Sequence, residues 1–394
     1  MAMATTRQRK DDPHTADPAG VGVHLHYAFE PGEQRGASLG SPLFDLLSSV
    51  REGGSIQHAA QDLGCSYRFL WGALKKWEHV LNEPLIVWSR GQRATLTPFA
   101  ERLLWAERRA RTRMQPHIEA LRADLARVLA DARDEHHQVL TVAASHGLAL
   151  PILQQVADSS AALHLDIHFQ GSLDSLRALN DGQCVVAGFP VPALHGAAPT
   201  FVKALKPLLK PDLHMLIGCV HRRQGLMLRR EHAGQVRGFG DLVHMPLRFA
   251  NRQLGSGTRL LVDHLMHEAG LAEQPLPGDA EHIEETHVAV AASIASGLAD
   301  VGLGIEAAAA EFGLHFVPLV EEDYFLVCLR PSLQHPAVQR LCAVLAGPEW
   351  RARLAVLPGY TPVAAPGVAL EMTQALPWWP GSARARPKSV THSQ

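Results

Sequence analysis

Cysteine is scarce and scattered in this sequence. Its five cysteines, among 394 residues, form no C-x-x-C pair, so neither a disulfide framework nor a cysteine-based zinc site is expected. No apolar run reaches the length of a membrane span, because polar residues or glycine interrupt each candidate. The first 20 residues are polar and lack the apolar segment of a signal peptide. We therefore expect a cytoplasmic protein with no membrane partner.

Motifs for catalysis and metal binding are also missing. The sequence has no Gly-rich phosphate loop, no G-x-S-x-G turn and no H-E-x-x-H, so no catalytic residue is assigned and an enzyme is not expected. Of the 23 histidines, His264 and His267 share a face of an expected helix, with His282 and His287 further along. No cysteine or carboxylate completes a zinc spacing around them. We interpret these histidines as solvated and predict no metal site.

Charge is nearly balanced overall but concentrated locally. The formal net charge of −2 neither favours nor excludes a nucleic-acid partner. Between Ser66 and Arg113, however, ten Lys/Arg stand against four Asp/Glu, whereas the chain from Met114 onward is mildly acidic. A short basic segment beside a mildly acidic remainder is typical of a DNA-binding head on a body that does not contact DNA.

The two ends and the first folded segment are distinguished by their patterns. Residues 1–20 are polar and residues 362–394 are rich in Pro, Ala and Gly, and we expect both to be disordered tails. Residues 21–97 open with an alternating segment typical of a strand, over 21–30. Helical patterns follow, and a hairpin pattern over 84–97 ends the segment.

A long helix and an α/β body follow. Residues 98–135 are rich in Ala, Leu, Arg and Glu, and Pro116 is expected to kink this helix. Over residues 136–361, short apolar runs alternate with helical patterns, which predicts a parallel or mixed sheet with crossover helices. This length accommodates two α/β lobes. We therefore expect a two-lobed α/β effector domain, preceded by an α+β winged helix-turn-helix and a long linker helix.

Two capped helices separated by Gly64 predict a helix-turn-helix. Ser55 caps the first helix and Ser66 the second. One face of the second helix is apolar, whereas another carries aromatic and basic side chains that suit phosphates and base edges in the major groove. The alternative is an ordinary helical hairpin with a solvated basic face. The candidate DNA-binding residues are Ser66, Tyr67, Arg68, Trp71, Lys75 and Lys76 on this helix, and Arg90 and Arg93 on the hairpin.

The stretch GSIQHAAQDLGCSY, which begins at Gly54, resembles the winged helix of the ModE and LysR regulator families. LNEPLI from Leu81 and LTPFA from Leu96 are similar to the ModE version of the wing and its exit. The resemblance covers about residues 25–105 and implies that the protein binds double-stranded DNA. It also implies that the helix after the wing pairs with a second subunit in a homodimer or homotetramer; a long helix within one domain is the alternative. The residues available for this seam are Leu103, Leu104, Ala110, Met114, Ile118, Leu121, Leu125 and Leu129.

Several expected strand ends in the body are followed by small polar residues and a helix start. Backbone N–H groups and the helix dipole at such ends favour an anion, and Ser and Thr hydroxyls add donors. Ser256 is the best single candidate, because the glycines on both sides allow the backbone to approach a ligand closely. Plain helix capping is the alternative for each such serine. The candidate ligand-binding residues are Ser145, Ser172, Arg252, Ser256, Gly257, Thr258 and Thr286.

The strings NRQLGSGTRLL from Asn251 and ASGLADVGLG from Ala295 resemble the periplasmic-binding-protein-like domain of one-component regulators and of MoeA-type proteins. The resemblance implies a type 2 fold, in which two lobes joined by crossing strands close on a small solute. Together with the ModE-like head, it points toward molybdenum or tungsten metabolism. No cofactor is expected; the effector is an oxyanion such as molybdate or tungstate, or a small carboxylate.

These observations favour a DNA-binding transcription regulator that senses a small polar or anionic ligand. Two alternatives are a molybdenum-cofactor-related enzyme and a solute-binding protein, each with an accessory DNA-binding head. The missing catalytic motifs argue against the first. The missing signal peptide argues against a transport role for the second.

Overall fold

The computed structural model describes residues 42–87, 93–133, 138–160, 162–194, 198–278, 281–376 and 378–379. The chain divides into two compact units, Met1–Glu107 and Arg108–Gln394, which are called the head and the body below. The strand expected over 21–30 lies outside the described residues, as does the tip of the hairpin.

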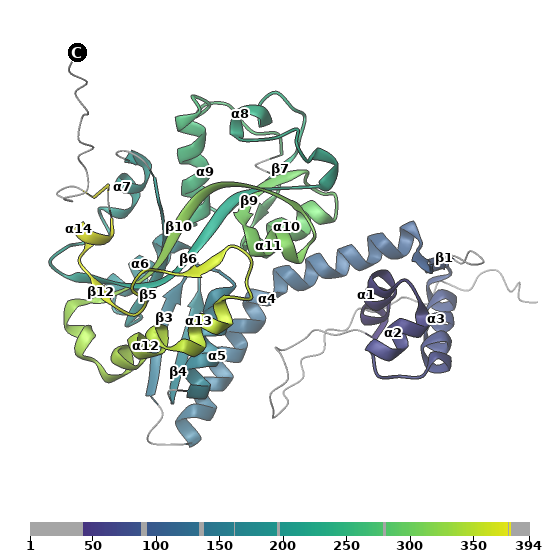
Figure 1. Ribbon diagram of the computed structural model, residues 1–394, viewed down its shortest axis with the longest axis horizontal. Coiled ribbons are helices and arrows are strands. Elements are labelled where there is room, and N and C mark those ends of the chain that lie inside the picture. Colours follow the sequence, from purple (N-terminus) through teal and green to yellow (C-terminus); the bar gives the residue numbers. More distant parts are fainter. Residues whose placement is uncertain are drawn as a thin grey trace, which may run out of the picture. The chain divides into compact units, whose positions relative to one another are not determined.

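Three short helices and a two-stranded hairpin make up the described part of the head (Figure 1). Their bounds are α1 Pro42–Gly53, α2 Ile56–Asp62, α3 Tyr67–Leu81, β1 Ile86–Val87 and β2 Thr95–Leu96. Leu47 and Leu74 are completely buried in the core between them. The helices end near Gly54 and Gly64, whose φ angles of 65° and 63° favour glycine because it has no Cβ. The breaks therefore fall where the sequence predicts them.

Helix α4, Pro98–Arg133, connects the head to the body along the chain. Thr97 caps it: the hydroxyl accepts from the Ala100 amide at 3.1 Å and donates to the Pro84 carbonyl at 2.8 Å. The helix continues through Pro116 without interruption. Among the residues expected in the dimer seam, Leu104 is buried in the head core, whereas Leu121 is 60% exposed.

One ten-stranded mixed sheet runs through the body in the order β4-β3-β5-β10-β6-β9-β7-β8, with β11 and β12 also paired to β6. Strand β3 is parallel to β4 and β5, and β7 is parallel to β8 and β9. The two longest strands, β6 and β10, are antiparallel and lie side by side through the middle of the body (Figure 1). The bounds are β3 Gln138–Ala144, β4 Leu163–Phe169, β5 Val186–Pro192, β6 His214–Leu228, β7 Phe249–Arg252, β8 Ile283–Glu284, β9 Val301–Ile305, β10 His315–Leu329, β11 Tyr360–Pro362 and β12 Ala369–Leu370.

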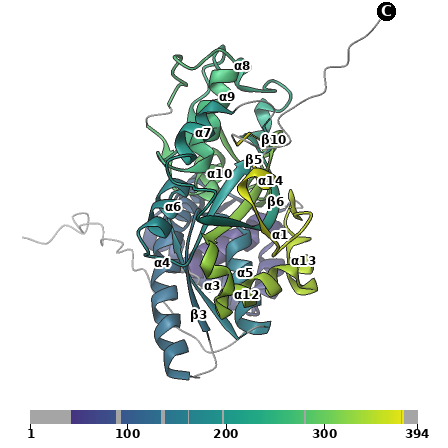
Figure 2. The ribbon, with the colours of Figure 1, turned by 90° about the vertical axis from the view of Figure 1, so that its left-hand side faces the viewer.

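Helices cover both faces of this sheet. On one face are α5 Ala149–Ser160, α10 His287–Ala295, α11 Glu306–Glu311, α12 Pro336–Ala346 and α13 Pro348–Leu354. On the other are α6 Ser172–Asn180, α7 Pro199–Leu205, α8 Phe239–Leu242, α9 Gly257–Glu268 and α14 Met372–Ala375. In Figure 2, α8 and α9 lie at the upper end of the body, and α12 and α13 at the lower end. These ends are two α/β lobes joined by β6 and β10, which confirms the expected two-lobed fold.

The segment after Pro362 is a correction to the expected disordered tail. Strand β12 pairs with β6, and α14 follows it. Trp378 and Trp379 are only 6% and 5% exposed and belong to the core of the body. The Pro, Ala and Gly content suggested disorder, but the two indole rings bury enough apolar surface to hold this segment in place.

Candidate functional site

The exposed face of α3 carries a row of stacked side chains. Tyr67, which is half exposed, stacks on Trp71 with ring centroids 6.3 Å apart. The ammonium group of Lys75 lies 4.9 Å from the centroid of the Trp71 ring, a cation–π contact. Lys75 is also paired with Glu78 at 2.7 Å. Arg68 and Lys76 are exposed beside this row. The spacing of three candidate residues along the helix therefore places them on one surface, as predicted.

Phe69 is an exposed aromatic residue that the sequence reasoning missed. Its side chain is 68% exposed in the first turn of α3, the part of a recognition helix that reaches base edges. The Ser66 hydroxyl accepts a hydrogen bond from the Phe69 amide at 3.2 Å, so Ser66 acts as the helix cap. The signal was present in the sequence, because Phe69 falls outside the apolar spacing of the core-facing residues.

The hairpin is attached to the turn between α1 and α2. The Ala94 amide donates to the Gly54 carbonyl at 2.8 Å. A Cβ at Gly54 would lie 2.9 Å from the Arg93 Cδ atom, so this turn requires glycine for close approach as well as for its positive φ. Arg93 is exposed at the base of the hairpin. Arg90 lies outside the described residues.

The body contains a cavity of about 340 Å³ where the ends of β3 and β4 meet the start of α10 and one face of α4. His146 stacks on Phe169, with ring centroids 4.8 Å apart and planes 13° apart. The other lining side chains are a mixture of apolar and polar groups, and they include the charged residues Arg111 and Glu311. The lining residues are Arg111, Thr112, Gln115, Pro116, His146, Gly147, Leu148, Pro151, Phe169, Thr286, His287, Val288, Ile305 and Glu311.

Arg252 does not line the cavity itself but contacts the backbone of the segment that leads into the lining residues Thr286 and His287. Its guanidinium donates to the carbonyls of Glu284 and Glu285, at 3.2 and 2.6 Å. Arg252 is only 3% exposed, and its Nη1 atom is buried without a hydrogen-bond partner. Burial, with repulsion from Arg222, lowers the Arg252 pKa to about 9. An unpaired guanidinium nitrogen in the interior is costly, so this position favours the arrival of a negatively charged partner.

Two histidines beside the cavity are held neutral. Burial and the charge of Arg252 lower the pKa of His146 to about 3. The same two causes lower the pKa of His287 well below its ordinary value. The Nδ1 atom of His287 is buried without a hydrogen-bond partner. Neutral imidazoles offer one donor and one acceptor each, so they add hydrogen-bonding capacity to the cavity without adding charge.

Two buried carboxylates near Arg252 are paired with other groups. The Arg222 Nε atom donates to Glu322 at 2.5 Å, and the Gln224 amide donates to both oxygens of the same carboxylate at 2.8 Å. Glu284 is bound through both carboxylate oxygens by Arg113, at 3.0 and 2.7 Å, and also by the Ser293 hydroxyl. Arg252 has no carboxylate oxygen within ion-pair distance among the described residues, so this buried cluster carries one uncompensated positive charge.

The predicted ligand residues on α6 and α9 lie where the two lobes touch. The Gly257 amide donates to the Ser172 hydroxyl at 3.1 Å. Ser256 caps α9: its hydroxyl accepts from the Arg259 amide at 3.1 Å and donates to the Gln253 carbonyl at 2.9 Å. Thr258 is 2% exposed. The Ser256 hydroxyl thus acts as a helix cap, and the Ser172 hydroxyl and the Gly257 amide are bonded to each other; a ligand role for these residues stays a prediction.

The remaining two predicted ligand residues are close to the cavity. Thr286 lines it and caps α10, with its hydroxyl accepting from the Ala289 amide at 3.0 Å. Ser145 precedes the lining residue His146, and its hydroxyl donates to the Tyr324 hydroxyl at 3.1 Å. Of the predicted ligand residues, Thr286 therefore lines the cavity, Ser145 adjoins a lining residue in the chain, and Arg252 contacts the backbone just before Thr286.

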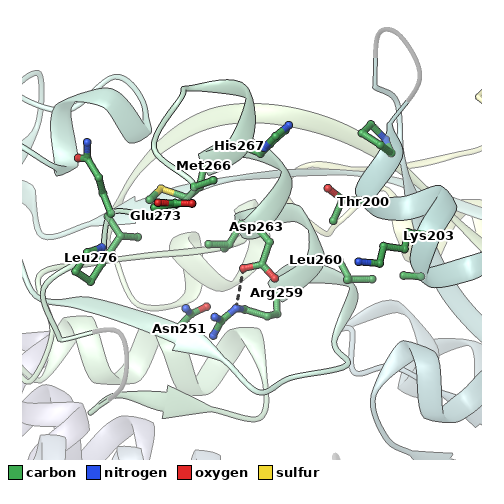
Figure 3. Close-up of a pocket in the computed structure, with 16 residues that line it drawn as sticks. Thr200, Lys203, Asn251, Arg259, Leu260, Asp263, Met266, His267, Glu273 and Leu276 are labelled. Carbon is green, nitrogen blue, oxygen red and sulfur yellow. Dashed lines mark hydrogen bonds and ion pairs between the residues drawn. The ribbon is translucent and has the colours of Figure 1, made fainter.

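A larger cavity, of about 840 Å³, lies between α7 and α9 (Figure 3). Arg259 is committed to Asp263 there, with Nε and Oδ1 3.0 Å apart. The charged side chains of Lys203, Asp263 and Glu273 are exposed, so each is solvated without a ligand. This cavity lacks the buried, uncompensated charge found next to His287.

Metal-ligating groups do not converge in the described part of the chain, where no three His, Cys, Asp or Glu side chains are placed to hold an ion. His264 is buried edge-on against Phe201, with centroids 5.9 Å apart, rather than solvated as expected. None of the described helices combines the length and apolarity required to cross a membrane.

Two family models match the chain. Residues 40–101 match the bacterial regulatory helix-turn-helix proteins of the lysR family, and residues 153–346 match the PBP superfamily domain. The chain therefore carries a LysR-type helix-turn-helix followed by a PBP-like substrate-binding domain. The resemblances to ModE and to MoeA-type proteins stay predictions.

Two curated relatives share parts of the sequence. The chain is 29% identical over 194 residues to the uncharacterized protein YvgK of Bacillus subtilis (strain 168), covering 49% of this chain and 61% of YvgK. It is 32% identical over 78 residues to the molybdenum-pterin-binding protein MopB of Rhodobacter capsulatus, covering 19% of this chain and 29% of MopB. The chain thus spans less than two thirds of either relative.

The chain also matches solved structures at low sequence identity. A C206 mutant of OxyR from Corynebacterium glutamicum is 17% identical, with 79% of this chain and 91% of that chain covered and a TM-score of 0.39. Full-length CbnR complexed with its target DNA is also 17% identical, with 77% and 97% covered and a TM-score of 0.39.

Proposed function

We propose that this protein is a cytoplasmic transcription regulator whose head binds double-stranded DNA through α3 and whose body binds a small organic anion. The lysR-family helix-turn-helix supports the DNA partner. On α3, the exposed cations Arg68 and Lys76 accompany exposed aromatic rings. Cations at this position contact phosphates and base edges, and aromatic rings add apolar contact with the bases. The exposed Met114 and Leu121 of α4 are the surface through which we propose that the chain forms a homodimer or homotetramer.

The unpaired Nη1 atom of Arg252 is the observation that carries the effector proposal. One buried positive charge without a carboxylate partner matches one negative charge on a ligand. The stack of His146 on Phe169 and the apolar side chains in the lining, Leu148, Pro151, Val288 and Ile305, match a ligand with a flat or apolar body. At about 340 Å³, the cavity is within the usual size range of small-molecule sites. A small carboxylate therefore has groups to contact both the positive charge and the apolar side chains, whereas a bare oxyanion has no apolar part.

Molybdate or tungstate is the second candidate effector. The partial similarity to MopB supports it, as do the Ser and Thr residues that cap helices around the lobe contact. A tetrahedral oxyanion would require the α6–α9 contact to open, because the Ser172 hydroxyl and the Gly257 amide are already bonded to each other.

A thermal-shift screen tests both candidates. The probes are formate, acetate, benzoate, sulfate, molybdate and tungstate, each added to the purified full-length chain. A ligand at 100 times its Kd stabilises the protein by about 2.7 kcal/mol, or roughly 5–10 °C for a domain of this size. We expect a shift with a carboxylate that Arg252→Met abolishes.

Arg259→Met is the matched control. It removes the same charge from the larger cavity of Figure 3, where the guanidinium already pairs with Asp263. A shift that survives Arg252→Met but is lost in Arg259→Met would move the effector site to the larger cavity. A shift with molybdate alone would replace the carboxylate assignment.

A further inference from the structure

Helix α4 has a role at the cavity that the sequence did not suggest. Thr112, Gln115 and Pro116 line the cavity, and Thr112 is buried, with its hydroxyl donating to the Arg108 carbonyl at 2.6 Å. The remaining walls come from the ends of β3 and β4 and the start of α10. A ligand in this space therefore contacts the helix whose other end begins at Pro98, directly after the hairpin.

Glu284 joins this helix to the residue that we assign as the anion anchor. Its carboxylate receives two hydrogen bonds from Arg113 of α4, and its backbone carbonyl receives one from Arg252. Glu284 is 2% exposed, whereas Arg113 is 52% exposed. Strand β8 is only two residues long and pairs with β7 at Arg252 and Glu284. Glu284 thus connects the anchor residue Arg252, the strand β8 and the helix α4.

We propose that α4 forms part of the effector site, so that a bound small organic anion contacts the helix that connects the head to the body along the chain. Gln115 and Thr112 are specificity-determining contacts of the ligand, and the Arg113–Glu284 ion pair holds the helix against the body. When an anion binds at Arg252, the ligand makes contacts with the α4 residues that line the cavity. These contacts stabilise α4 in its position against the body. A ligand changes a two-state equilibrium only through such differential contacts, and here they are made on the helix itself. This inference rests on the proposed effector site.

Affinity measurements test whether Thr112 and Gln115 of α4 contact the ligand. Benzoate binding is measured by thermal shift over a concentration series with the full-length wild type, Gln115→Ala and Thr112→Val. Arg109→Ala is the control, because Arg109 is on the same helix and does not line the cavity. We expect the Kd for benzoate to rise about tenfold in each wall variant, the effect of losing one good polar contact, and to stay unchanged in the control.

Hydrogen–deuterium exchange tests the docking without any ligand. Arg113→Met removes the cation of the ion pair and leaves the Glu284 carboxylate bonded to the Ser293 hydroxyl, and Arg109→Met removes the same charge elsewhere on α4. We expect amide exchange over 108–118 to accelerate at least tenfold in Arg113→Met only, and benzoate to restore part of the protection.

The outcomes separate the two proposals. If the benzoate affinity depends on Arg252 but does not change in the Gln115 and Thr112 variants, the proposal that α4 contacts the ligand is overturned. The proposed function is then unaffected. Unchanged exchange in Arg113→Met overturns the docking role of the ion pair. A wild-type chain that no carboxylate stabilises overturns the proposed effector class and, with it, this inference.

Discussion

The head and the body place their charged side chains in opposite ways. On α3 of the head, Arg68, Lys75 and Lys76 are exposed, and aromatic rings lie exposed beside them. In the body, Arg222 and Arg252 are 2% and 3% exposed, and Arg222 is paired with the buried Glu322. An exposed cation keeps its hydration and suits a large polyanion such as DNA, with binding that salt weakens. A buried cation has already lost its hydration and suits one small anion that can enter the interior.

The largest expected effect concerns the paired charges of the body. Glu322→Gln leaves Arg222 buried without its carboxylate, and breaking a buried ion pair from one side costs about 3–5 kcal/mol. Urea unfolding of the full chain measures the loss. Glu321→Gln is the control, because Glu321 is 64% exposed and exposed pairs contribute about 0–1 kcal/mol. Equal losses in the two variants would mean that the body charges are solvated like those of the head.

Acid should destabilise the body through its neutral histidines. The pKa of His287 is far below its ordinary value, whereas the unfolded chain takes up this proton near pH 6.5. The free energy of unfolding therefore falls as the pH drops below about 6.5, by up to about 1.4 kcal/mol per pH unit for each such histidine. His221, whose pKa is raised by its hydrogen bond to Asp323, acts in the opposite direction.

The variant His287→Asn isolates this contribution. Urea unfolding at pH 7, 6 and 5 should show a shallower pH dependence in the variant than in the wild type, by close to one proton. An identical pH dependence in both proteins would contradict the burial of a neutral His287 in the body.

The smallest expected effect concerns the capping of the exposed helix α3. Ser66→Ala removes the acceptor for the Phe69 amide and should destabilise the head by about 1 kcal/mol. Thermal unfolding followed by tryptophan fluorescence measures it. Gln57→Ala, at an exposed position of α2, should change the transition little; a Ser66→Ala protein as stable as this control would show that the cap contributes nothing.

Local signals predicted the head better than the body. The caps at Ser55 and Ser66 and the turn at Gly64 are decided by neighbouring residues, and the structure has all three. The longer strands and the two lobes of the body were also predicted, because each of these strands is a separate apolar run, whereas the short strands β11 and β12 were not.

The cavity could not be assembled from the sequence in the same way. Arg113 and Glu284 are 171 positions apart, and no local pattern shows that a residue on the linker helix meets a two-residue strand. The Ser and Thr pattern identified helix starts correctly, yet Ser256 uses its hydroxyl as a cap. Arg252 was included as one of several possible charges. Only its burial and its unpaired nitrogen distinguish it from Arg259.

A crossed measurement tests the contrast between head and body most directly. Arg68→Met removes an exposed guanidinium, and Arg252→Met removes a buried one. For each variant we measure the affinity for a 30-base-pair DNA duplex over a salt series. We also measure how strongly the carboxylate found in the screen stabilises the variant. We predict that Arg68→Met weakens DNA binding and reduces its salt dependence by about one phosphate contact, and that it keeps the thermal shift caused by the ligand. We predict that Arg252→Met loses this thermal shift and keeps the DNA affinity measured without ligand. A ligand shift that survives Arg252→Met, or a DNA affinity indifferent to Arg68→Met, would contradict the account.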